Sequence, residues 1–416
     1  MKQDKHRNSA FWRTVVVIGI LFAAASNHPV YAEWEWRSLA SMSAERSGHT
    51  AAAFSHKIYV FGGIRRNMRQ ENLRSAEVYY PQYDRWEDIE PLPIALYQAS
   101  AVSIGEFIYI FGGLCNERMN NQIMRYEPSK NEYIIIGEMP VPRRAMGAVN
   151  FGRYVMLAGG LAQRMEYPRN GLLWDARENR WTETPPLNQP SSGAGVVNNG
   201  IVWIVGGMYF GPLDRIEIFD EGRWRLLERA RMPEPCGEMG AVFLNDSTLV
   251  IAGGTTLRVG ISNTVRYMNT RTLQWSNLPA MRQARTSFPL VRLDSRLYAV
   301  GGGISMQQMG EATAEVEVLV QTDAVWDNPP SDKLPTDTKV VLYPNPVVGK
   351  AAFLLPGTAS QITIFDANGR VLLHEVVNSQ NSLWNMPSGL LINGNFYYIL
   401  TLNDGRWLNG RFTVLR

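Results

Sequence analysis

Pairs of adjacent glycines recur along most of this 416-residue chain at nearly constant intervals. Successive pairs are separated by 50, 47, 47, 47 and 48 residues. Each pair ends a short run of β-branched and aromatic residues, which is typical of a buried strand. The six pairs are Gly62-Gly63, Gly112-Gly113, Gly159-Gly160, Gly206-Gly207, Gly253-Gly254 and Gly301-Gly302. A repeat of this length predicts β units that stack in a ring, as in a propeller.

Large aromatic residues keep the same period as the glycine pairs. Each of the six precedes the next pair by 25 to 29 residues: Trp36, Trp86, Tyr133, Trp181, Trp224 and Trp275. Such a side chain offers a large apolar area for packing on the neighbouring unit. The glycines permit positive φ and close backbone approach where a strand ends. Because a single four-stranded unit cannot bury both of its faces, we expect the units to stack.

These landmarks resemble the kelch repeat, in which a glycine pair is followed by a tyrosine and, about seven residues later, by a tryptophan. Tyr79 with Trp86, Tyr126 with Tyr133, and Trp174 with Trp181 fit the pattern, and the last three repeats follow it more loosely. The resemblance covers roughly residues 34–326 and implies an all-β fold with a six-bladed kelch-type β-propeller. Trp36 and Trp326 both resemble the last strand of a blade. We therefore expect the N-terminal segment to join the final blade or to lie against it.

Residues 1–32 resemble an export signal. A basic start is followed by 13 apolar residues, Thr14–Ser26, and by Val30 and Ala32 at the small-residue positions before a cleavage site. This pattern predicts a signal peptide that is cleaved after Ala32. The alternative, an uncleaved membrane anchor, would need about 20 apolar residues to span a bilayer. Export through the periplasm, to the medium or to the cell surface, is the expected localisation.

The composition changes after the repeats. We assign residues 33–326 to the propeller, and residues 327–338, which are rich in Pro, Asp and Thr, to a linker. Residues 339–416 lack the glycine period and contain alternating runs around two turn signals, Ala367-Asn368-Gly369 and Asn403-Asp404-Gly405. About five to seven short strands in such a segment predict a small Ig-like β-sandwich.

This C-terminal segment resembles the sorting domain of type IX secretion substrates of Bacteroidota. The residues that carry the resemblance are Tyr343, Pro344, Asn345, Pro346, Asp366, Gly369, Gly394 and the terminal Arg416. The resemblance implies passage through the outer membrane, with the type IX machinery and its sortase as partners. It also implies attachment to outer-membrane lipopolysaccharide or release. An ordinary sandwich appended to a propeller is the alternative.

The charge and the residue counts exclude several classes of site. Residues 1–32 hold 4 of the 41 basic and 1 of the 38 acidic residues, which leaves 37 of each in the mature chain. A neutral chain gives no electrostatic reason to expect nucleic acid. With 2 cysteines and 5 histidines in the whole chain, we expect no transition metal and no other cofactor.

Three arginines occupy equivalent places in the repeat. Arg46, Arg143 and Arg285 each lie 16 residues before a glycine pair. If these positions converge at the mouth of the channel, their guanidinium groups suit an anionic ligand. The loops after the glycine pairs add further arginines: Arg65, Arg66, Arg69, Arg118, Arg164 and Arg258. The alternative is that the repeated arginines bridge strands.

No catalytic motif is present, and we assign no catalytic residue. Glu234 and Glu238 are candidate acid–base groups in the loop that enters the fifth repeat. Surface carboxylates are common in loops, however, and Cys115 and Cys236 are more simply explained as free, partly buried thiols.

Three functions remain open at this point. The favoured one is a secreted or cell-surface protein whose propeller face binds a glycan or a protein. The second is a sugar-modifying kelch enzyme, since the resemblance includes bacterial propellers that interconvert the anomers of sialic acid. The third is a structural component of a surface layer. Because propellers host many activities, the fold alone does not decide between them.

Overall fold

The computed structural model describes residues 34–321, apart from 68, 152, 199 and 307–310. Beyond them it describes 341–343, 347–348, 352–354, 359–365, 371–377, 383–385, 394–402 and 407–415. The predicted cleavage site after Ala32 and the predicted linker lie outside these residues. The chain divides into two compact units, Met1–Trp326 and Asp327–Arg416.

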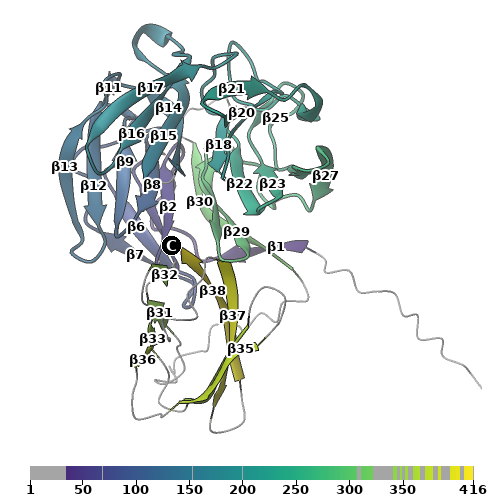
Figure 1. The fold of residues 1–416 in the computed structure, drawn as a ribbon. Coiled ribbons are helices and arrows are strands. Elements are labelled where there is room, and N and C mark those ends of the chain that lie inside the picture. The colour runs from purple at the N-terminus through teal and green to yellow at the C-terminus, as the bar shows by residue number, and fades with distance from the viewer. Residues whose placement is uncertain are drawn as a thin grey trace, which may run out of the picture. The chain divides into compact units, whose positions relative to one another are not determined.

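The first unit consists of six four-stranded antiparallel sheets within its described residues (Figure 1). From the innermost strand outward, sheet 1 is β2 (Thr50–Phe54), β3 (Lys57–Phe61), β6 (Ala76–Tyr80) and β7 (Arg85–Ile89). Sheet 2 is β8 (Ser100–Ile104), β9 (Phe107–Phe111), β12 (Gln122–Glu127) and β13 (Glu132–Glu138). Sheet 3 is β14 (Arg144–Phe151), β15 (Tyr154–Leu161), β16 (Asn170–Asp175) and β17 (Arg180–Pro186).

The other three sheets repeat this order. Sheet 4 is β18 (Gly195–Asn198), β19 (Val202–Val205), β20 (Ile216–Asp220) and β21 (Arg223–Leu226). Sheet 5 is β22 (Gly240–Asn245), β23 (Thr248–Ala252), β26 (Val265–Asn269) and β27 (Gln274–Leu278). Sheet 6 is β28 (Leu290–Leu293), β29 (Arg296–Gly303), β30 (Ala312–Gln321) and β1 (Trp34–Leu39).

The N-terminal strand closes the ring. β1 pairs antiparallel with β30, from the opposite end of the unit, with Trp36 opposite Leu319. Each innermost strand contacts the innermost strands of both neighbouring sheets, and β2 and β28 complete the circle. The all-β prediction is confirmed, and of the two placements expected for the N-terminal segment the structure shows the one within the final sheet.

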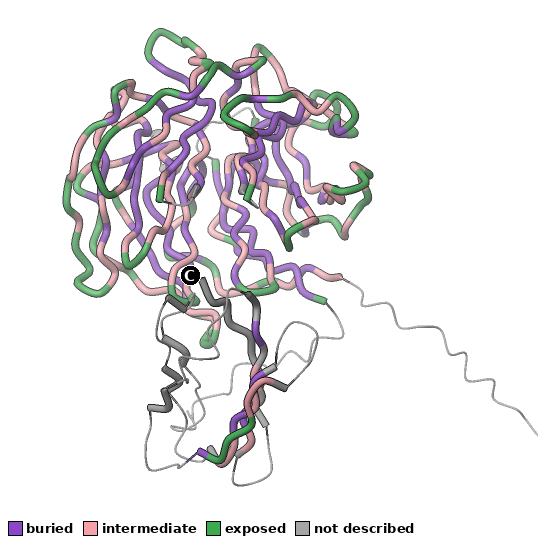
Figure 2. The backbone as a smooth tube through the Cα atoms, in the orientation of Figure 1, coloured by how far each residue is buried: buried purple, intermediate pink, exposed green. Residues whose placement is uncertain are grey.

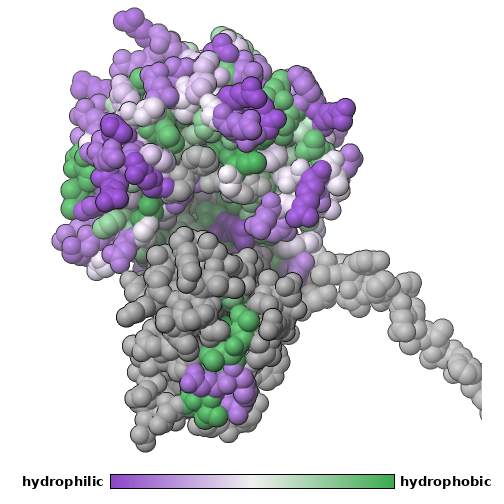
Figure 3. Space-filling view, in the orientation of Figure 1, coloured by the Kyte–Doolittle hydropathy of each residue, from purple (hydrophilic) through white to green (hydrophobic). Residues whose placement is uncertain are grey.

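The core of this unit lies between neighbouring sheets. One apolar cluster fills each of the six interfaces, for example Ile58 and Tyr79 of sheet 1 against Tyr298 and Val318 of sheet 6. The inner strands are accordingly buried and the outer strands are more exposed (Figure 2). Figure 3 shows hydrophilic side chains over much of the visible surface of the sheets.

Three of the repeated tryptophans join an outermost strand to the preceding sheet. The indole N–H of Trp86 donates to the Ala40 carbonyl at 2.9 Å, and that of Trp181 donates to Glu138 at 2.9 Å. Trp36 donates in the same way to Pro279 at 2.8 Å. A polar group at the edge of the apolar ring is thereby satisfied while the ring packs on the neighbour.

The glycine pairs end the second strand of each sheet with a positive φ at both positions. At Gly112, with φ at 62°, a Cβ atom would lie 2.3 Å from the Arg143 carbonyl oxygen. Glycine is therefore required for close approach to the next sheet as well as for the backbone conformation.

After each glycine pair the chain makes a connection to the third strand. Three of these connections form small hairpins, β4 (Ile64–Asn67) with β5 (Arg69–Asn72), β10 (Leu114–Cys115) with β11 (Arg118–Met119), and β24 (Thr255–Thr256) with β25 (Gly260–Ile261). Two short 3-10 helices, η1 (Gln163–Met165) and η2 (Glu228–Ala230), complete the described elements of this unit.

In antiparallel sheets of this order, these connections and the segments that lead into the innermost strands lie on one face of the ring. We call this face the connection face, and it contains the candidate site.

The second unit consists of two sheets in its described residues. One contains β31 (Val341–Tyr343), β33 (Ala352–Leu354) and β36 (Leu383–Asn385). The other contains β32 (Val347–Val348), β38 (Trp407–Leu415), β37 (Gly394–Leu402), β34 (Ala359–Phe365) and β35 (Val371–Val376), in that order. Its buried residues include Ile362, Ile364, Phe396 and Leu400.

Two of the expected sorting residues fall on strands of this unit: Tyr343 ends β31 and Gly394 begins β37. Pro344, Asn345, Pro346, Asp366, Gly369 and Arg416 lie outside the described residues. Strands β34 and β35 pair antiparallel across the first predicted turn, and β37 and β38 pair across the second. Within the part of the chain that the structure describes, no helix is long and apolar enough to cross a membrane.

Candidate functional site

The three repeated arginines are buried and serve the interior of the sheets. Arg46 and Arg285 are 0% exposed and Arg143 is 2% exposed. Arg46 donates to the carbonyls of Gly62, at 2.9 Å, and Ser75, at 3.0 Å, and forms an ion pair with Glu77. Our expectation that these residues bind a ligand at the channel mouth is therefore corrected, because their guanidinium groups already have partners and are closed to solvent. The alternative, in which the arginines bridge strands, describes what the structure shows.

Arg285 repeats the arrangement of Arg46 in sheet 6. It donates to the carbonyls of Gly301, at 2.8 Å, and Glu315, at 3.0 Å, and pairs with Glu317. Burial is the main cause that lowers the pKa of both arginines, and the paired glutamates oppose it. Each pair thus connects the end of the second strand to the third strand of its own sheet.

Arg143 occupies the same place in sheet 3 without a glutamate partner. Leu172 lies opposite Leu157 on the third strand, at the register where sheets 1 and 6 carry Glu77 and Glu317. Arg143 donates instead to the Asn170 carbonyl at 2.7 Å and the Gly159 carbonyl at 3.4 Å. Burial lowers its pKa to about 10.

The arginines of the connections differ in their surroundings. Arg65 pairs with Glu71 at 2.9 Å across its own hairpin. Arg118, Arg164 and Arg258 are exposed on three different connections. The side chains of Arg66 and Arg69 lie outside the described residues. Of the described side chains, Arg65 lies near enough to Arg46 for its charge to help lower the pKa of that buried guanidinium.

A closed ring of backbone hydrogen bonds surrounds the channel where the innermost strands begin. One residue of each sheet donates its N–H to the carbonyl of its equivalent in the preceding sheet, at 2.7 to 2.9 Å. The six residues all adopt the left-handed conformation, with φ between 49° and 58°. They are Gly48, Gln98, Ala145, Gly193, Glu238 and Ser287. Gly48 donates to Ser287 and so completes the circle. We call these residues the backbone ring.

Sequence reasoning missed this ring. Three members of the ring lie two residues after the repeated arginines, so their positions could have been derived from the repeat. The residue types at the six positions share no pattern, however, that would mark them as a ring. Four of the six are not glycine, although the left-handed conformation costs a residue with a Cβ about 1–2 kcal/mol. Each bond of the ring contributes about 0.5–1.5 kcal/mol, which offsets much of that cost.

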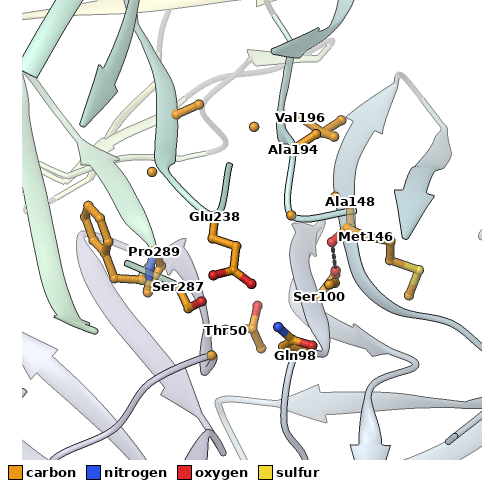
Figure 4. Close-up of a pocket in the computed structure, with 18 of the residues that line it drawn as sticks. Thr50, Gln98, Ser100, Met146, Ala148, Ala194, Val196, Glu238, Ser287 and Pro289 are labelled. Atoms are coloured by element: carbon orange, nitrogen blue, oxygen red, sulfur yellow. Dashed lines mark hydrogen bonds between the residues drawn. The ribbon is translucent and has the colours of Figure 1, made fainter. Parts of the chain in front are cut away.

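The backbone ring borders a cavity of about 230 Å³ at the mouth of the channel. The side chains of Gln98, Glu238 and Ser287 enter it from the ring, and Thr50 enters from the first position of β2 (Figure 4). In Figure 4 the carboxylate of Glu238 points toward the hydroxyl groups of Thr50 and Ser287. The remaining wall is mostly apolar and includes Ala148 and Val196.

Glycines in three innermost strands keep this channel narrow. A Cβ at Gly147 would lie 2.2 Å from Val196, and one at Gly195 would lie 2.4 Å from Ala241. A Cβ at Gly240 would lie 2.5 Å from Leu290. Neighbouring inner strands can therefore approach one another closely only because these side chains are absent.

Glu238 lacks an ion-pair partner among the described residues. The Thr286 hydroxyl lies 3.4 Å from its carboxylate. On the far side of the mouth, Arg144 donates to the side-chain oxygen of Gln98. Burial, and then the charge of Glu238, raise the pKa of Tyr97 to about 12, so its phenol is neutral at physiological pH.

The other acid–base and thiol candidates have structural roles. Glu234 pairs with Arg266 at 3.3 Å. Cys236 is buried, and burial raises the pKa of its thiol to about 12, which makes it an unreactive group. Cys115 is also a free cysteine. In the described part of the chain, no group of three His, Cys, Asp or Glu residues could hold a metal ion.

Exposed apolar side chains also lie on the connection face, outside the lining of the cavity. Phe210 is 89% exposed and Leu257 is 81% exposed, and both belong to connections that follow glycine pairs. Among the described residues, the large apolar side chains exposed on such connections are here called the apolar rim: Met165, Phe210, Leu257, Val259 and Met306. These residues come from sheets 3, 4, 5 and 6, which are consecutive in the ring. Sequence reasoning missed the rim because single apolar residues in loops have no periodicity.

Comparison with known proteins identifies the repeat. A family model described as the KLHDC2/KLHL20/DRC7 Kelch-repeats domain matches residues 31–207. Residues 31–207 are therefore similar to a kelch-repeat domain, and the six sheets that the structure describes form a propeller. The chain is 27% identical over 202 residues to Kelch-like protein 23 of Mus musculus, covering 46% of this chain and 35% of that protein. It is 24% identical over 214 residues to Beta-scruin of Limulus polyphemus, covering 48% of this chain and 23% of that protein.

A solved structure supports the fold over a longer stretch. The structure titled "Structure of YjhT" covers 69% of the present chain and 98% of its own, with a TM-score of 0.59 and 18% sequence identity. At that identity the likeness concerns the fold alone. The chain spans about a third or less of the length of these two curated relatives, so their activities do not transfer directly.

The bridging role of the buried arginines predicts a graded loss of stability. Arg46→Gln leaves the Glu77 carboxylate buried without its cation, which costs about 3–5 kcal/mol. Arg143→Gln removes hydrogen bonds to two carbonyls without stranding a charge, so the cost is about 1–3 kcal/mol. Denaturant unfolding of the full mature chain measures both. Equal and negligible losses would contradict the bridging role.

Proposed function

We propose that this protein is an exported binding protein whose six-bladed propeller recognises a protein partner through its connection face. The observation that carries the proposal is the apolar rim. Five of the eight large apolar side chains that are exposed on the described residues of the propeller belong to it. Contiguous exposed apolar surface on a soluble protein commonly marks an interaction site.

The position of these side chains supports an interface. The other three exposed apolar residues are Tyr83, Ile134 and Ile135, which lie away from the connection face. Rim residues from four consecutive sheets lie on the same face of the ring as the polar mouth of the channel. An apolar surface around a small polar centre offers both buried area and orientation to a partner.

An aromatic cluster gives the rim a candidate anchor. Tyr167 and Tyr209 pack edge to face with ring centroids 5.2 Å apart, and Phe210 lies 4.7 Å from Tyr209. Phe210 has a φ of 54°, which is costly for an aromatic residue, and still points its ring into solvent. Backbone strain of this kind concentrates at functional loops.

A glycan ligand, a sugar-modifying activity and a structural surface-layer role stay alternatives. The polar mouth is compatible with a sugar, and the kelch resemblance includes sugar-modifying propellers. Neither feature supports its function as directly as the apolar rim supports a protein partner. Water satisfies the polar groups of the mouth, whereas exposed Phe and Leu side chains gain free energy only when a partner buries them.

The apolar rim predicts loss of partner binding without loss of fold. Phe210→Ser and Leu257→Ser should each weaken binding of a partner purified on the mature protein by about 30-fold or more, because interface anchors contribute about 2 kcal/mol or more. The matched control is Ile135→Ser, which removes an exposed apolar side chain from the outer strand of sheet 2. Titration calorimetry and thermal melts give the two readouts. Equal affinity of the rim and control variants would reject the rim as the interface.

We further propose the export route that the sequence indicates. A signal peptide is cleaved after Ala32, and the Ig-like C-terminal unit directs type IX secretion to the surface, with sortase processing and either lipopolysaccharide attachment or release. The resemblance of Tyr343–Pro346, Asp366, Gly369 and Gly394 to the sorting domain carries this proposal.

The export proposal predicts where a truncated chain accumulates. Deletion of residues 339–416 in the native host should strand the propeller in the periplasm, since the address is removed. Cell fractionation and surface proteolysis measure the location, and N-terminal sequencing should find Glu33 first. Unchanged surface display of the truncated chain would contradict the sorting role.

A further inference from the structure

We propose that the channel mouth is a socket for the ammonium group of a lysine side chain, with Glu238 as its counter-ion. The inference rests on the proposed function, because it assigns that lysine to the protein partner that covers the apolar rim. It specifies the chemistry that the partner presents at the centre of the interface.

Glu238 occupies one of the six positions of the backbone ring. Two of the six ring positions are Gly48 and Gly193, which adopt the left-handed conformation at no steric cost. Glu238 adopts it with a φ of 55°, and its side chain enters the cavity. The hydrogen bonds of the ring hold this conformation, and with it they fix the Glu238 side chain in the cavity.

The carboxylate of Glu238 has no ion-pair partner among the described residues. The three other glutamates that are buried in the sheets, Glu77, Glu217 and Glu317, each have an arginine partner. Glu238 has no such partner among the described residues, and its carboxylate accepts a long hydrogen bond of 3.4 Å from the Thr286 hydroxyl. A partly buried carboxylate gains from a cation that enters the cavity, because the local dielectric is lower than that of water.

Further hydrogen-bond acceptors lie around the Glu238 carboxylate. Figure 4 shows the hydroxyl oxygens of Thr50 and Ser287 beside the Glu238 carboxylate. An ammonium group carries three donors and no acceptor, so three converging oxygens satisfy it. The cavity, at about 230 Å³, has room for the end of a lysine side chain and ordered water.

The other charged groups near the mouth leave this side open to a cation. Arg144 belongs to sheet 3 and donates to the oxygen of Gln98, across the channel from Glu238. His49 also borders the cavity, and burial, together with nearby Arg46, lowers its pKa well below the usual value, so it is neutral at pH 7. Glu238 is thus the one carboxylate on the described wall of the cavity.

The narrow channel favours lysine over arginine. Inner strands approach closely at Gly147, Gly195 and Gly240, and the cavity of about 230 Å³ that they line has a mostly apolar wall. A lysine stem is unbranched and apolar, so it can follow the apolar wall while its charge reaches the oxygens. A planar guanidinium needs a wider, two-oxygen contact.

The experiment uses the full mature chain and two small probes, Nα-acetyl-lysine N-methylamide and its Nε-acetylated form, which lacks the charge. Saturation-transfer NMR titrations should show saturable binding of the first probe only. Glu238→Gln should weaken that binding about tenfold or more, since a hydrogen-bonded charge is lost. The matched control is Glu166→Gln, which removes an exposed charge from the same face.

Three outcomes would overturn the socket: equal binding of both probes, no saturable binding of either, or equal losses in the Glu238 and Glu166 variants. The probes do not need the apolar rim, so Phe210→Ser should bind them normally. Failure of the socket with an intact rim effect leaves the proposed function standing. Probe binding without any rim effect rejects the proposed function and keeps the cation site.

Discussion

The closed ring of six backbone hydrogen bonds is the constraint on which the rest of the propeller depends. Each sheet contributes one N–H and one carbonyl, and every donor finds its acceptor only if the last sheet meets the first. The bond from Gly48 to the Ser287 carbonyl joins residues far apart in the chain and closes the circle. The ring therefore fixes the size of the channel and the position from which each innermost strand begins. Around it, each interface between sheets is filled by its own apolar cluster.

The buried arginines connect the second and third strands within single sheets. Arg46 and Arg285 connect the end of a second strand to a glutamate on the third strand, and Arg143 makes only the backbone part of the arrangement. Their burial explains why a repeated arginine marks the fold and not a ligand. Such a pair adds little net stability, because desolvation consumes most of the attraction, but the loss of one partner leaves a buried charge unpaired.

The repeat was predictable because it follows from steric need at fixed intervals. The glycine pairs, the strands before them and the periodic tryptophans could each be identified from residue type and spacing. The placement of the arginines could not, since a guanidinium suits both a solvent-facing anion site and a buried bridge. The backbone ring escaped prediction for another reason: Gln98, Ala145, Glu238 and Ser287 take their conformation from tertiary hydrogen bonds, which override their own preference for negative φ. Glu238 was a candidate as a loop carboxylate, whereas its neighbours Thr50 and Ser287 gave no signal.

The connection face combines a hydrogen-bonded centre with an exposed apolar rim. The ring holds Glu238, Gln98 and Ser287 at the mouth, and the connections present Phe210 and Leu257 around it. Native-state hydrogen exchange tests this division most directly. The six ring amides, including those of Gly48 and Glu238, should exchange only through global unfolding and rank among the slowest in the protein, while the amides of Phe210 and Leu257 exchange through local opening. Ring amides that exchange as fast as those of the rim would contradict the central claim that this ring holds the propeller closed.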